Sequence, residues 1–546
     1  MAKGYRPVLR EQPFLLPPDM REWLPDDHPV WLVIGAVGQV DTAAFHAARR
    51  TGGAGAAGYD PDMLVTLLVW AYANGVTSSR RIEAACRTDV AFRVVCAGSA
   101  PDHVTVARFR AGFAGAVETL FGEVLVLCAR LGMGKLGTVT VDGMKIAANA
   151  SKAANRGEEA LRKLAAQRAG EHAATDAAED ALFGAGRRGD EVPPEVANPA
   201  SRDERIRRAL ADLEAERAAA EAARAAQARE YLAAARAGTV GAGPPPAAAA
   251  AEAAAVRLER ARAARAAQLA GLAARAAGPV VPGRRRYRPR AGIEDYSRVK
   301  AARQALDAAQ ARAAAAERKA AGKDKDPAPV RNITDPDSRL MPVRGGGFLQ
   351  GYNAQNVASG DELIIATELT GDTTDTRWFE PMLAKAQAAA AVITAHQPAP
   401  AATPATTAAS GIGQILADAG YCSEHNLTTD GPDRLIATGK HRDLEKAARH
   451  AATGPHATGQ DTPAEPIAAM AARLATPDGI AAYRQRGHIA ETPHGHIKHN
   501  MGIRRLTMRG KPKATAEWTF ICAVHNLVKA ITTRHLTSHA LTALAS

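Results

Sequence analysis

The sequence predicts an α/β protein in which a central sheet is joined to an all-helical N-terminal region and to a long helical insertion. Runs of β-branched and apolar residues at 138–141 and 414–417 are typical of strands. The second run is apolar on both faces, which favours a central strand with helices covering both sides of the sheet. Residues 153–330 are rich in alanine, arginine and glutamate, which favour helix.

Composition limits the class of partner. The chain has 546 residues, a formal net charge of +12 and a pI of about 9.6, which favours a polyanion such as nucleic acid or a membrane surface. No apolar run reaches the roughly 18 residues that span a bilayer. The five cysteines are scattered and form no Cys-x-x-Cys pair, so neither a disulfide framework nor a zinc site is expected. We expect a cytoplasmic, nucleoid-associated protein.

Residues 1–135 form the first predicted domain, with a role in DNA binding or assembly. Helices are expected over 61–75, 78–98 and 102–132, the first beginning after Asp60. Arg108 and Arg110 fall near an expected helix start, where they could serve a helix-turn-helix-like DNA reader. The alternative is an ordinary helical bundle with solvated arginines.

The first strand of the sheet is expected within residues 136–152. Val139 and Val141 point to one face, while Thr140 and Asp142 point to the other. Asp142 is expected at or near the end of this strand. Taken alone, an acid before a glycine is most simply a turn former.

Residues 153–330 are predicted to be a helical, coiled-coil-like insertion that is partly disordered. Helices are expected over 201–238, 247–277 and 296–322. Gly238 is a suitable stop for the first of them. The basic cluster at 283–290 could grip phosphates, or it could be an ordinary solvated charge run.

The sheet is predicted to be completed by residues 331–445. Strands are expected over 351–359, 362–370, 414–417 and 433–440, and a helix over 374–393. Gly360 and Asp361 are expected to turn the first two strands into a hairpin, and Asp375 or a neighbour to cap the helix. Residues 446–478 are predicted to be a flexible loop, and 479–546 a helix, a basic connector and a second helix.

Three acids indicate a metal site. Asp142 and Asp418 each follow a predicted strand, and a charged group in a buried strand needs a partner. Glu491, on a basic helix, is the best third acid, although alone it would be an ordinary salt-bridging residue. Oxygen ligands of this kind suit Mg²⁺ or Mn²⁺, and two such ions can clamp the attacking and leaving oxygens of a phosphoryl transfer. We expect the three carboxylates to converge.

The motifs VTVDGMKIAANAS, TDPDSRLM…GYNAQNV, LADAGYCSE and YRQR…E…K occur in an order that resembles bacterial insertion-sequence transposases of the DDE class. The resemblance implies an RNase H-like core, metal-ligand roles for Asp142, Asp418 and Glu491, and signature roles for Tyr483, Arg486 and Lys498. The chain departs from the signature in two ways. His494 stands where Phe is usual, and four residues rather than three separate Arg486 from Glu491.

Basic residues around these acids are the candidate DNA contacts. The expected set is Tyr483, Arg486, Lys498, Arg504, Arg505, Lys440, Arg442, Arg108 and Arg110. Asp335 and Asp337 are expected to be turn formers beside Pro336, and Cys422 to be a packing residue. The irregularly spaced histidines are expected on the surface or facing DNA rather than in a metal cluster: His488, His494, His496 and His499.

The resulting expectation is a DNA transposase that binds the terminal inverted repeats of its element and target DNA, as a homodimer or higher oligomer. It would cut a phosphodiester with two Mg²⁺ or Mn²⁺ ions and join the 3′-hydroxyl to the target. Three alternatives remain: an RNase H-like nuclease without strand transfer, a non-catalytic DNA-binding relic, and a structural coiled-coil protein, which explains only 153–330.

Overall fold

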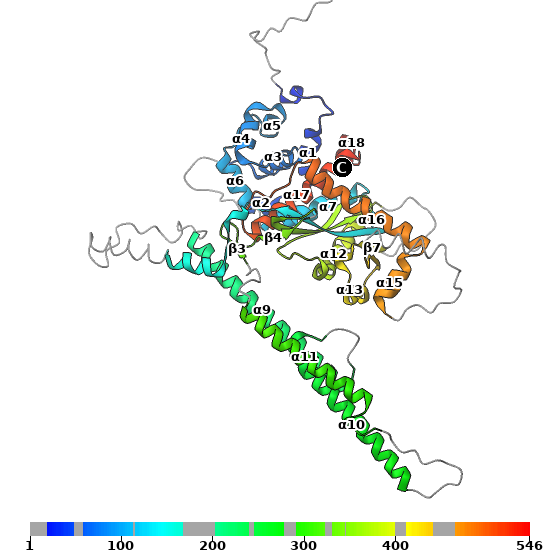
Figure 1. Ribbon diagram of the computed structural model, residues 1–546. Helices are drawn as coiled ribbons and strands as arrows, with labels where there is room; N and C mark the ends of the chain where they lie inside the picture. Colours follow the sequence, from blue (N-terminus) through cyan, green and yellow to red (C-terminus); the bar gives the residue numbers. More distant parts are fainter. Residues whose placement is uncertain are drawn as a thin grey trace, which may run out of the picture. The chain divides into compact units, whose positions relative to one another are not determined.

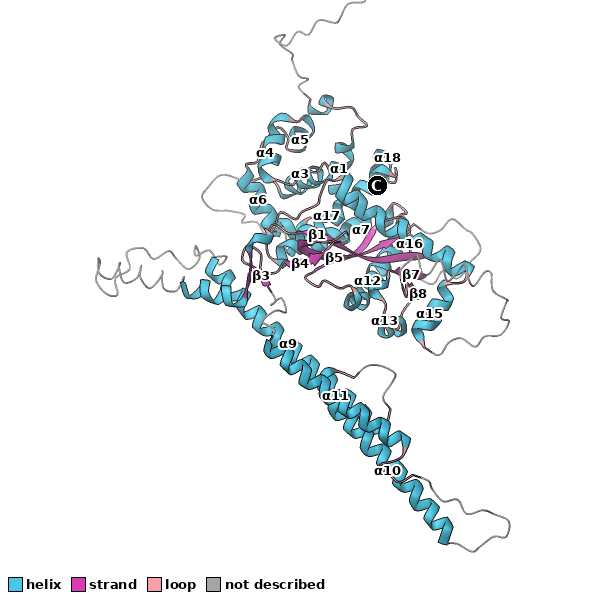
Figure 2. Cartoon of the chain, viewed as in Figure 1, coloured by secondary structure: helices cyan, strands magenta, loops and turns pink. Residues whose placement is uncertain are grey.

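The computed structural model describes residues 19–47, 58–112, 115–167, 202–239, 245–277, 291–322, 330–343, 345–398, 411–439 and 465–545 (Figures 1 and 2). They belong to two units, of which one is residues 156–331 and the other is built from the chain on both sides of that segment. No helix in the described ranges could span a bilayer.

A mixed six-stranded sheet lies at the centre of the larger unit, in agreement with the predicted α/β class. Its strands are β1 (Thr138–Ala147), β4 (Arg339–Pro342), β5 (Phe348–Ser359), β6 (Ile364–Thr370), β7 (Gln414–Ala417) and β8 (Asp433–Ile436). The order is β4-β5-β1-β7-β8, and β6 also pairs with β5. β5 and β6 form the predicted antiparallel hairpin, whereas β1, β7 and β8 are parallel to one another.

Side-chain alternation in β5 shows that both faces of the sheet are covered. Asn356 contacts His494 and Trp518, which come from the C-terminal helices α16 (Pro477–Gly495) and α17 (Lys511–Thr532). Its neighbour Gln355 contacts Asp375 and Tyr421, beside α12 (Phe379–His396). Because successive strand residues point to opposite faces, α16 and α17 lie on one side and the segment that leads into α12 on the other.

The N-terminal region is helical, as expected. Its elements are η1 (Met20–Trp23), α1 (Pro29–Val37), α2 (Ala43–Ala47), α3 (Pro61–Ala73), α4 (Ser79–Thr88), α5 (Val90–Val95), α6 (His103–Ala111) and α7 (Val117–Arg130). Asp60 caps α3 through hydrogen bonds from two backbone amides, as predicted. Arg108 and Arg110 lie in the last turn of α6, not near its start, because that helix has only nine residues and ends at Ala111.

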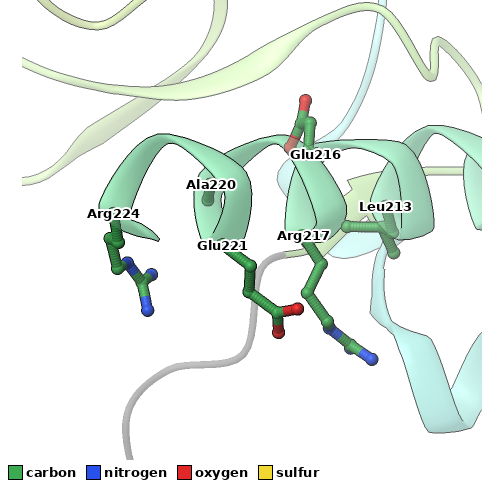
Figure 3. A pocket seen from close by; sticks show the side chains of 6 residues that line it. All are labelled: Leu213, Glu216, Arg217, Ala220, Glu221 and Arg224. Atoms are coloured by element: carbon green, nitrogen blue, oxygen red, sulfur yellow. The ribbon is translucent and has the colours of Figure 1, made fainter. Parts of the chain in front are cut away.

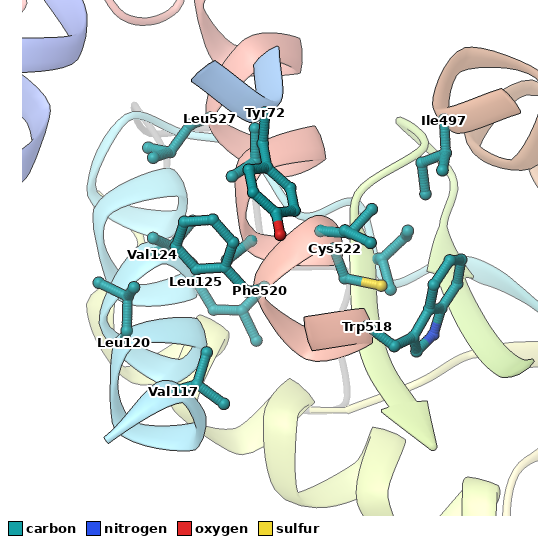
Figure 4. Packing of buried hydrophobic residues seen from close by; sticks show 14 of the residues in the cluster. Tyr72, Val117, Leu120, Val124, Leu125, Ile497, Trp518, Phe520, Cys522 and Leu527 are labelled. Atoms are coloured by element: carbon teal, nitrogen blue, oxygen red, sulfur yellow. The ribbon is translucent and has the colours of Figure 1, made fainter. Parts of the chain in front are cut away.

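α17 joins the N-terminal helices to the sheet. Its Phe520 meets the ring of Tyr72 edge to face at 5.2 Å, and it packs beside Leu120 and Val124 of α7 (Figure 4). All four side chains are buried. Burying an aromatic or large aliphatic side chain contributes about 1.5–3 kcal/mol, so this contact makes the N-terminal helices part of the same core as the sheet.

One of the remaining elements of the larger unit is a helix where a flexible loop was expected. These elements are η3 (Lys152–Ala154), η5 (Thr376–Trp378), η6 (Ala419–Tyr421), α13 (Glu424–Thr428), α15 (Pro466–Leu474), the π-helix η7 (His496–Asn500) and α18 (Ser538–Ala545). The predicted loop 446–478 therefore contains helix α15, whose Met470 and Leu474 are buried against the last strands. Residues 440–464 lie outside the described part.

The smaller unit contains three long helices, α9 (Arg202–Ala237), α10 (Ala250–Ala277, after the short η4, Ala247–Ala249) and α11 (Ser297–Gly322). Gly238, with φ +81°, ends α9 as predicted. The helices pack through alanines such as Ala209 and Ala253, with a few larger residues such as Leu213. The basic cluster 283–290 lies outside the described residues.

The chain leaves and re-enters the larger unit at neighbouring points. Asn332 donates a hydrogen bond to the Asn155 side chain at 3.1 Å and another to the Ser151 carbonyl at 2.7 Å. Around these residues β2 (Asn155–Gly157) and β3 (Val330–Asn332) form a two-stranded sheet. The two ends of the segment 156–331 are therefore held side by side.

Candidate active site

Asp142 and Asp418 lie on neighbouring strands at the same level. The parallel pairing of β1 with β7 ends at the pair Val141 and Ala417, so the next residue of each chain segment is one of the two acids. Asp418 directly follows its strand, as expected. Asp142 does not end its strand, because the antiparallel pairing of β1 with β5 continues to Ala147.

Arg486 on α16 binds both carboxylates. Its Nη2 lies 3.0 Å from Oδ1 of Asp142 and 3.7 Å from Oδ2 of Asp418. Burial raises the pKa of Asp142, and the Arg486 charge opposes this increase. Burial and the charge of Asp142 likewise raise the pKa of Asp418. The two acids thus share the Arg486 guanidinium, and a further positive charge placed near them would favour their ionised forms.

Glu491 lies on the same helix as Arg486 but is exposed. Its charge contributes to raising the pKa of Asp142, although less than burial does. Helix α16 contains Pro493 and passes into the π-helix η7 at His496, so the α-helix that carries Glu491 ends before Lys498. Lys498 is half-buried, and burial lowers its pKa while the Asp142 charge opposes that change.

A fourth carboxylate, Asp375, lies against Gly143, the residue that follows Asp142. Asp375 was not identified from the sequence as a site residue. A Cβ added to Gly143 would meet Oδ1 of Asp375 at 2.6 Å, so the carboxylate fills the space that a side chain there would need. Asn353 and Gln355 each donate an amide hydrogen bond to this oxygen, at 2.6 and 2.7 Å, and Lys145 forms an ion pair with it.

Asp375 was expected to cap a helix, but its side chain makes no cap hydrogen bond and faces this network instead. Its Oδ2 lies 3.3 Å from a Cβ built on Gly420, and Oδ1 of Asp418 lies 2.9 Å from the same point. Its sequence position, five residues after β6 and directly before the turn that leads into α12, gives no signal of this role.

His494 was expected on the surface, but it is buried and faces the first acid. Its Nδ1 lies 3.6 Å from Oδ2 of Asp142, and its Nε2 lies 3.0 Å from Nδ2 of Asn356. Burial, with the charges of Lys498 and Arg486, lowers the pKa of His494 to about 4. His496 is also partly buried, against His525, whereas His488 and His499 are exposed as expected.

Of the other predicted DNA contacts, Tyr483 is hydrogen-bonded within the protein, whereas Arg504 and Arg505 are exposed. Tyr483 donates its hydroxyl to the carbonyl of Ala417 at 3.2 Å and so supports the residue before Asp418. Arg504 and Arg505 are exposed, and the Arg504–Leu506 segment pairs with Ala147 at the far end of β1.

Of the two arginines of α6 that were expected to contact DNA, Arg108 is exposed, whereas Arg110 is not. Arg110 is buried, and its guanidinium binds the carbonyl of Thr77 and the hydroxyl of Tyr72. It is therefore occupied inside the helical region and does not face solvent. Lys440 and Arg442 lie outside the described residues.

Asp335 and Asp337 bind the backbone at the start of α17. The hydrogen bonds described for them do not involve the three predicted acids. Asp335 accepts a hydrogen bond from the amide of Gly510, and Asp337 one from the amide of Lys511. The hydroxyl of Tyr352 lies 2.9 Å from both oxygens of Asp335. The two aspartates thus connect the segment before β4 to the helix that follows the basic connector.

In two other candidate sites, some of the charged groups already have partners. A pocket on α9 is lined by Leu213, Glu216, Arg217, Ala220, Glu221 and Arg224 (Figure 3). Its Arg217 forms an ion pair with Glu158. At the surface, His46 lies near Asp60 and Asp62, but Asp60 caps α3, and Asp62 accepts hydrogen bonds from other side chains.

Two family models match the chain. Residues 18–112 match a transposase domain (DUF772), and residues 447–531 match a transposase DDE domain. The second match contains Tyr483, Arg486, Glu491 and Lys498, whereas Asp142 and Asp418 lie before it. No match was found among curated proteins or among solved structures.

The two matched transposase domains indicate a DNA transposase. They support an insertion-sequence transposase of the DDE class.

Proposed function

We propose that this transposase cuts phosphodiester bonds at the terminal inverted repeats of its element and joins the resulting 3′-hydroxyl to target DNA. The observation that carries the proposal is the pairing of Asp142 and Asp418, which follow Val141 and Ala417 in adjacent parallel strands and share one cation, the Arg486 guanidinium. The mixed sheet with helices on both faces supports an RNase H-like core.

The residues present fit divalent metal ions. Asp142 and Asp418 are partly buried acids that already hold a positive charge between them, and oxygen ligands suit Mg²⁺ or Mn²⁺. We assign the metal-ligand roles to these two acids and to Glu491. When bound, two such ions polarise the phosphodiester and stabilise the attacking and leaving oxygens.

The basic residues around the acids bind and orient DNA in this proposal. Arg486 presents a guanidinium at the acids, and this planar donor also matches phosphate geometry. Lys498 is half-buried beside Asp142, and Arg504 and Arg505 are exposed on the connector that follows. These cations would hold the phosphates on either side of the cut and make binding strongly salt-dependent.

The test is Asp418→Asn in the full chain. Asn keeps the size of the side chain but removes the charge needed to hold a metal, so cleavage of element-end DNA should be lost while binding, measured by fluorescence anisotropy, is retained. Asp478→Asn is the matched control, because Asp478 is an exposed acid in the first turn of α16. Cleavage by Asp418→Asn at the wild-type rate would contradict the assignment.

The same assay separates the alternatives. Wild-type protein that cuts DNA but yields no joined product is a nuclease without strand transfer. Wild-type protein that binds element ends in Mg²⁺ and in Mn²⁺ and cuts in neither is a DNA-binding relic.

A further inference from the structure

A chain of hydrogen bonds leads from α17 to His494, whose ring faces the first acid of the site. The indole Nε1 of Trp518 lies 2.8 Å from Oγ1 of Thr367, which lies 2.6 Å from Oδ1 of Asn356. Nδ2 of Asn356 lies 3.0 Å from Nε2 of His494. These four residues are at least nine-tenths buried, and they come from α17, β6, β5 and α16.

The direction of every bond in this chain is fixed by its first member. An indole N–H can only donate, so the hydroxyl of Thr367 accepts from Trp518. The hydroxyl has one proton, and Oδ1 of Asn356, at 2.6 Å, is a much closer acceptor for it than the Gln355 carbonyl at 3.5 Å. The indole also approaches that Oδ1, at 3.3 Å. The carbonyl oxygen of Asn356 is therefore the end that faces Thr367, and its amide nitrogen faces the histidine.

Asn356 in turn sets the tautomer of His494. Because Nδ2 of Asn356 can only donate, Nε2 of His494 must carry the lone pair, and the proton of the neutral ring is on Nδ1. That nitrogen faces Oδ2 of Asp142 at 3.6 Å, while Oδ1 of the same carboxylate lies 3.0 Å from Arg486. At 3.6 Å the contact is longer than a hydrogen bond, but such contacts are often long before substrate binds and tighten afterwards.

We propose that His494 is a positioning residue of the metal site, which holds the Asp142 carboxylate through Nδ1–H and is itself oriented by the Asn356 amide. This inference rests on the proposed function of Asp142 as a metal ligand. A donor on one oxygen and the guanidinium on the other fix the plane of the carboxylate. Groups that orient a ligand in this way typically change metal affinity 10- to 100-fold when they are replaced.

The same geometry excludes a second role for this histidine. A metal ligand needs a lone pair on the nitrogen that faces the site, and Asn356 keeps the only lone pair of the neutral ring on the other nitrogen. His494 is thus a donor to Asp142 and not a fourth ligand. The site keeps an all-oxygen ligand set, which suits Mg²⁺ and Mn²⁺.

The first experiment measures the tautomer in the wild-type full chain. Histidine labelled with ¹⁵N gives different nitrogen shifts for the Nδ1–H and Nε2–H forms, and the signal of His494 is identified by its loss in His494→Asn. We expect the Nδ1–H form. A ring protonated on Nε2 would overturn the proposal without any variant having to fold.

The second experiment measures binding of Mn²⁺ alone, by electron paramagnetic resonance. His494→Phe keeps a ring but has no donor and should weaken Mn²⁺ binding about 10- to 100-fold, whereas His494→Asn has an amide at the position of Nδ1 and should restore most of it. His539→Phe, at an exposed position of α18, is the matched control. Thermal melting checks that each variant folds, and His494→Leu is a smaller replacement if the Phe variant does not.

The outcomes separate this proposal from the proposed function. Equal Mn²⁺ affinity in wild type and in a folded variant without the donor overturns the role of His494 alone. Wild type that binds no Mn²⁺ overturns the metal site itself, while the tautomer measurement still reports on the hydrogen-bond chain.

Discussion

Gly143→Ala should disturb the site by displacing Asp375. The added Cβ would lie 2.6 Å from Oδ1 of Asp375 and 2.7 Å from Nε2 of Gln355, well inside van der Waals contact. Overpacking of this kind costs about 1–3 kcal/mol. We therefore expect the free energy of unfolding to fall by about 2 kcal/mol and cleavage to decrease, because Asp375 lies beside Asp418 and Gly420.

A double-mutant cycle tests the cause. In an Asp375→Ala background the closest oxygen is gone, and Gln355 loses the carboxylate that holds its amide, so Gly143→Ala should cost about 1 kcal/mol less than in the wild type. The control is Gly137→Ala, since a Cβ there meets nothing within 4 Å and should change stability by less than about 0.5 kcal/mol.

Urea unfolding followed by tryptophan fluorescence is a suitable assay, because the five tryptophans all lie outside residues 156–331 and the signal reports the larger unit. Equal costs of Gly143→Ala in both backgrounds would refute the argument that Asp375 occupies this space.

Three further predictions use the same stability assay. Glu517→Ala should cost about 3 kcal/mol or more, since the buried carboxylate accepts hydrogen bonds from Tyr72 and from two connector amides, which would lose their partner; a cost below about 1 kcal/mol would contradict it. Tyr483→Phe should cost about 1 kcal/mol and slow cleavage without weakening DNA binding, whereas weaker binding would show a DNA contact instead. Hydrogen bonds from Arg473 lower the pKa of Asp433 to about 2, so the stability contributed by its charge is present above about pH 4 and is lost as the pH falls towards 2. Both side chains are over 40% exposed, so Asp433→Asn should cost at most about 1 kcal/mol at pH 7 and less at pH 3; an equal cost at both would contradict the linkage.

The sequence predicts the strand pattern because β-branched and apolar residues dominate β6, the first half of β1 and most of β7, and these suit a covered sheet. It also predicts the position of Asp418 after its strand. It does not predict how far β1 continues past Asp142, because that length depends on pairing with β5, more than two hundred residues away. The predictions for Lys440 and Arg442 lie outside the described residues.

His494 and Asp375 were misassigned for the same physical reason. Both are polar residues whose local pattern fits a surface or a helix cap, and both are drawn inward by partners distant in the sequence. Arg110 is a third case, since its guanidinium is taken up by Thr77 and Tyr72. Local patterns report backbone preference, whereas the burial of a polar group depends on donors and acceptors that only the folded chain brings together.

Because Ala147 pairs with Arg505, strand β1 fixes the distance between Asp142 and the segment that carries Arg505. Asp142 and Ala147 are five residues apart on one strand, which is about 16 Å at about 3.3 Å per residue. The axial rise of B-DNA is about 3.4 Å per base pair, so this length corresponds to about five base pairs. If Asp142 marks the cut and Arg505 a bound phosphate, the offset between them is set by a rigid strand, and we expect protection of the backbone to begin at a constant distance from the scissile bond.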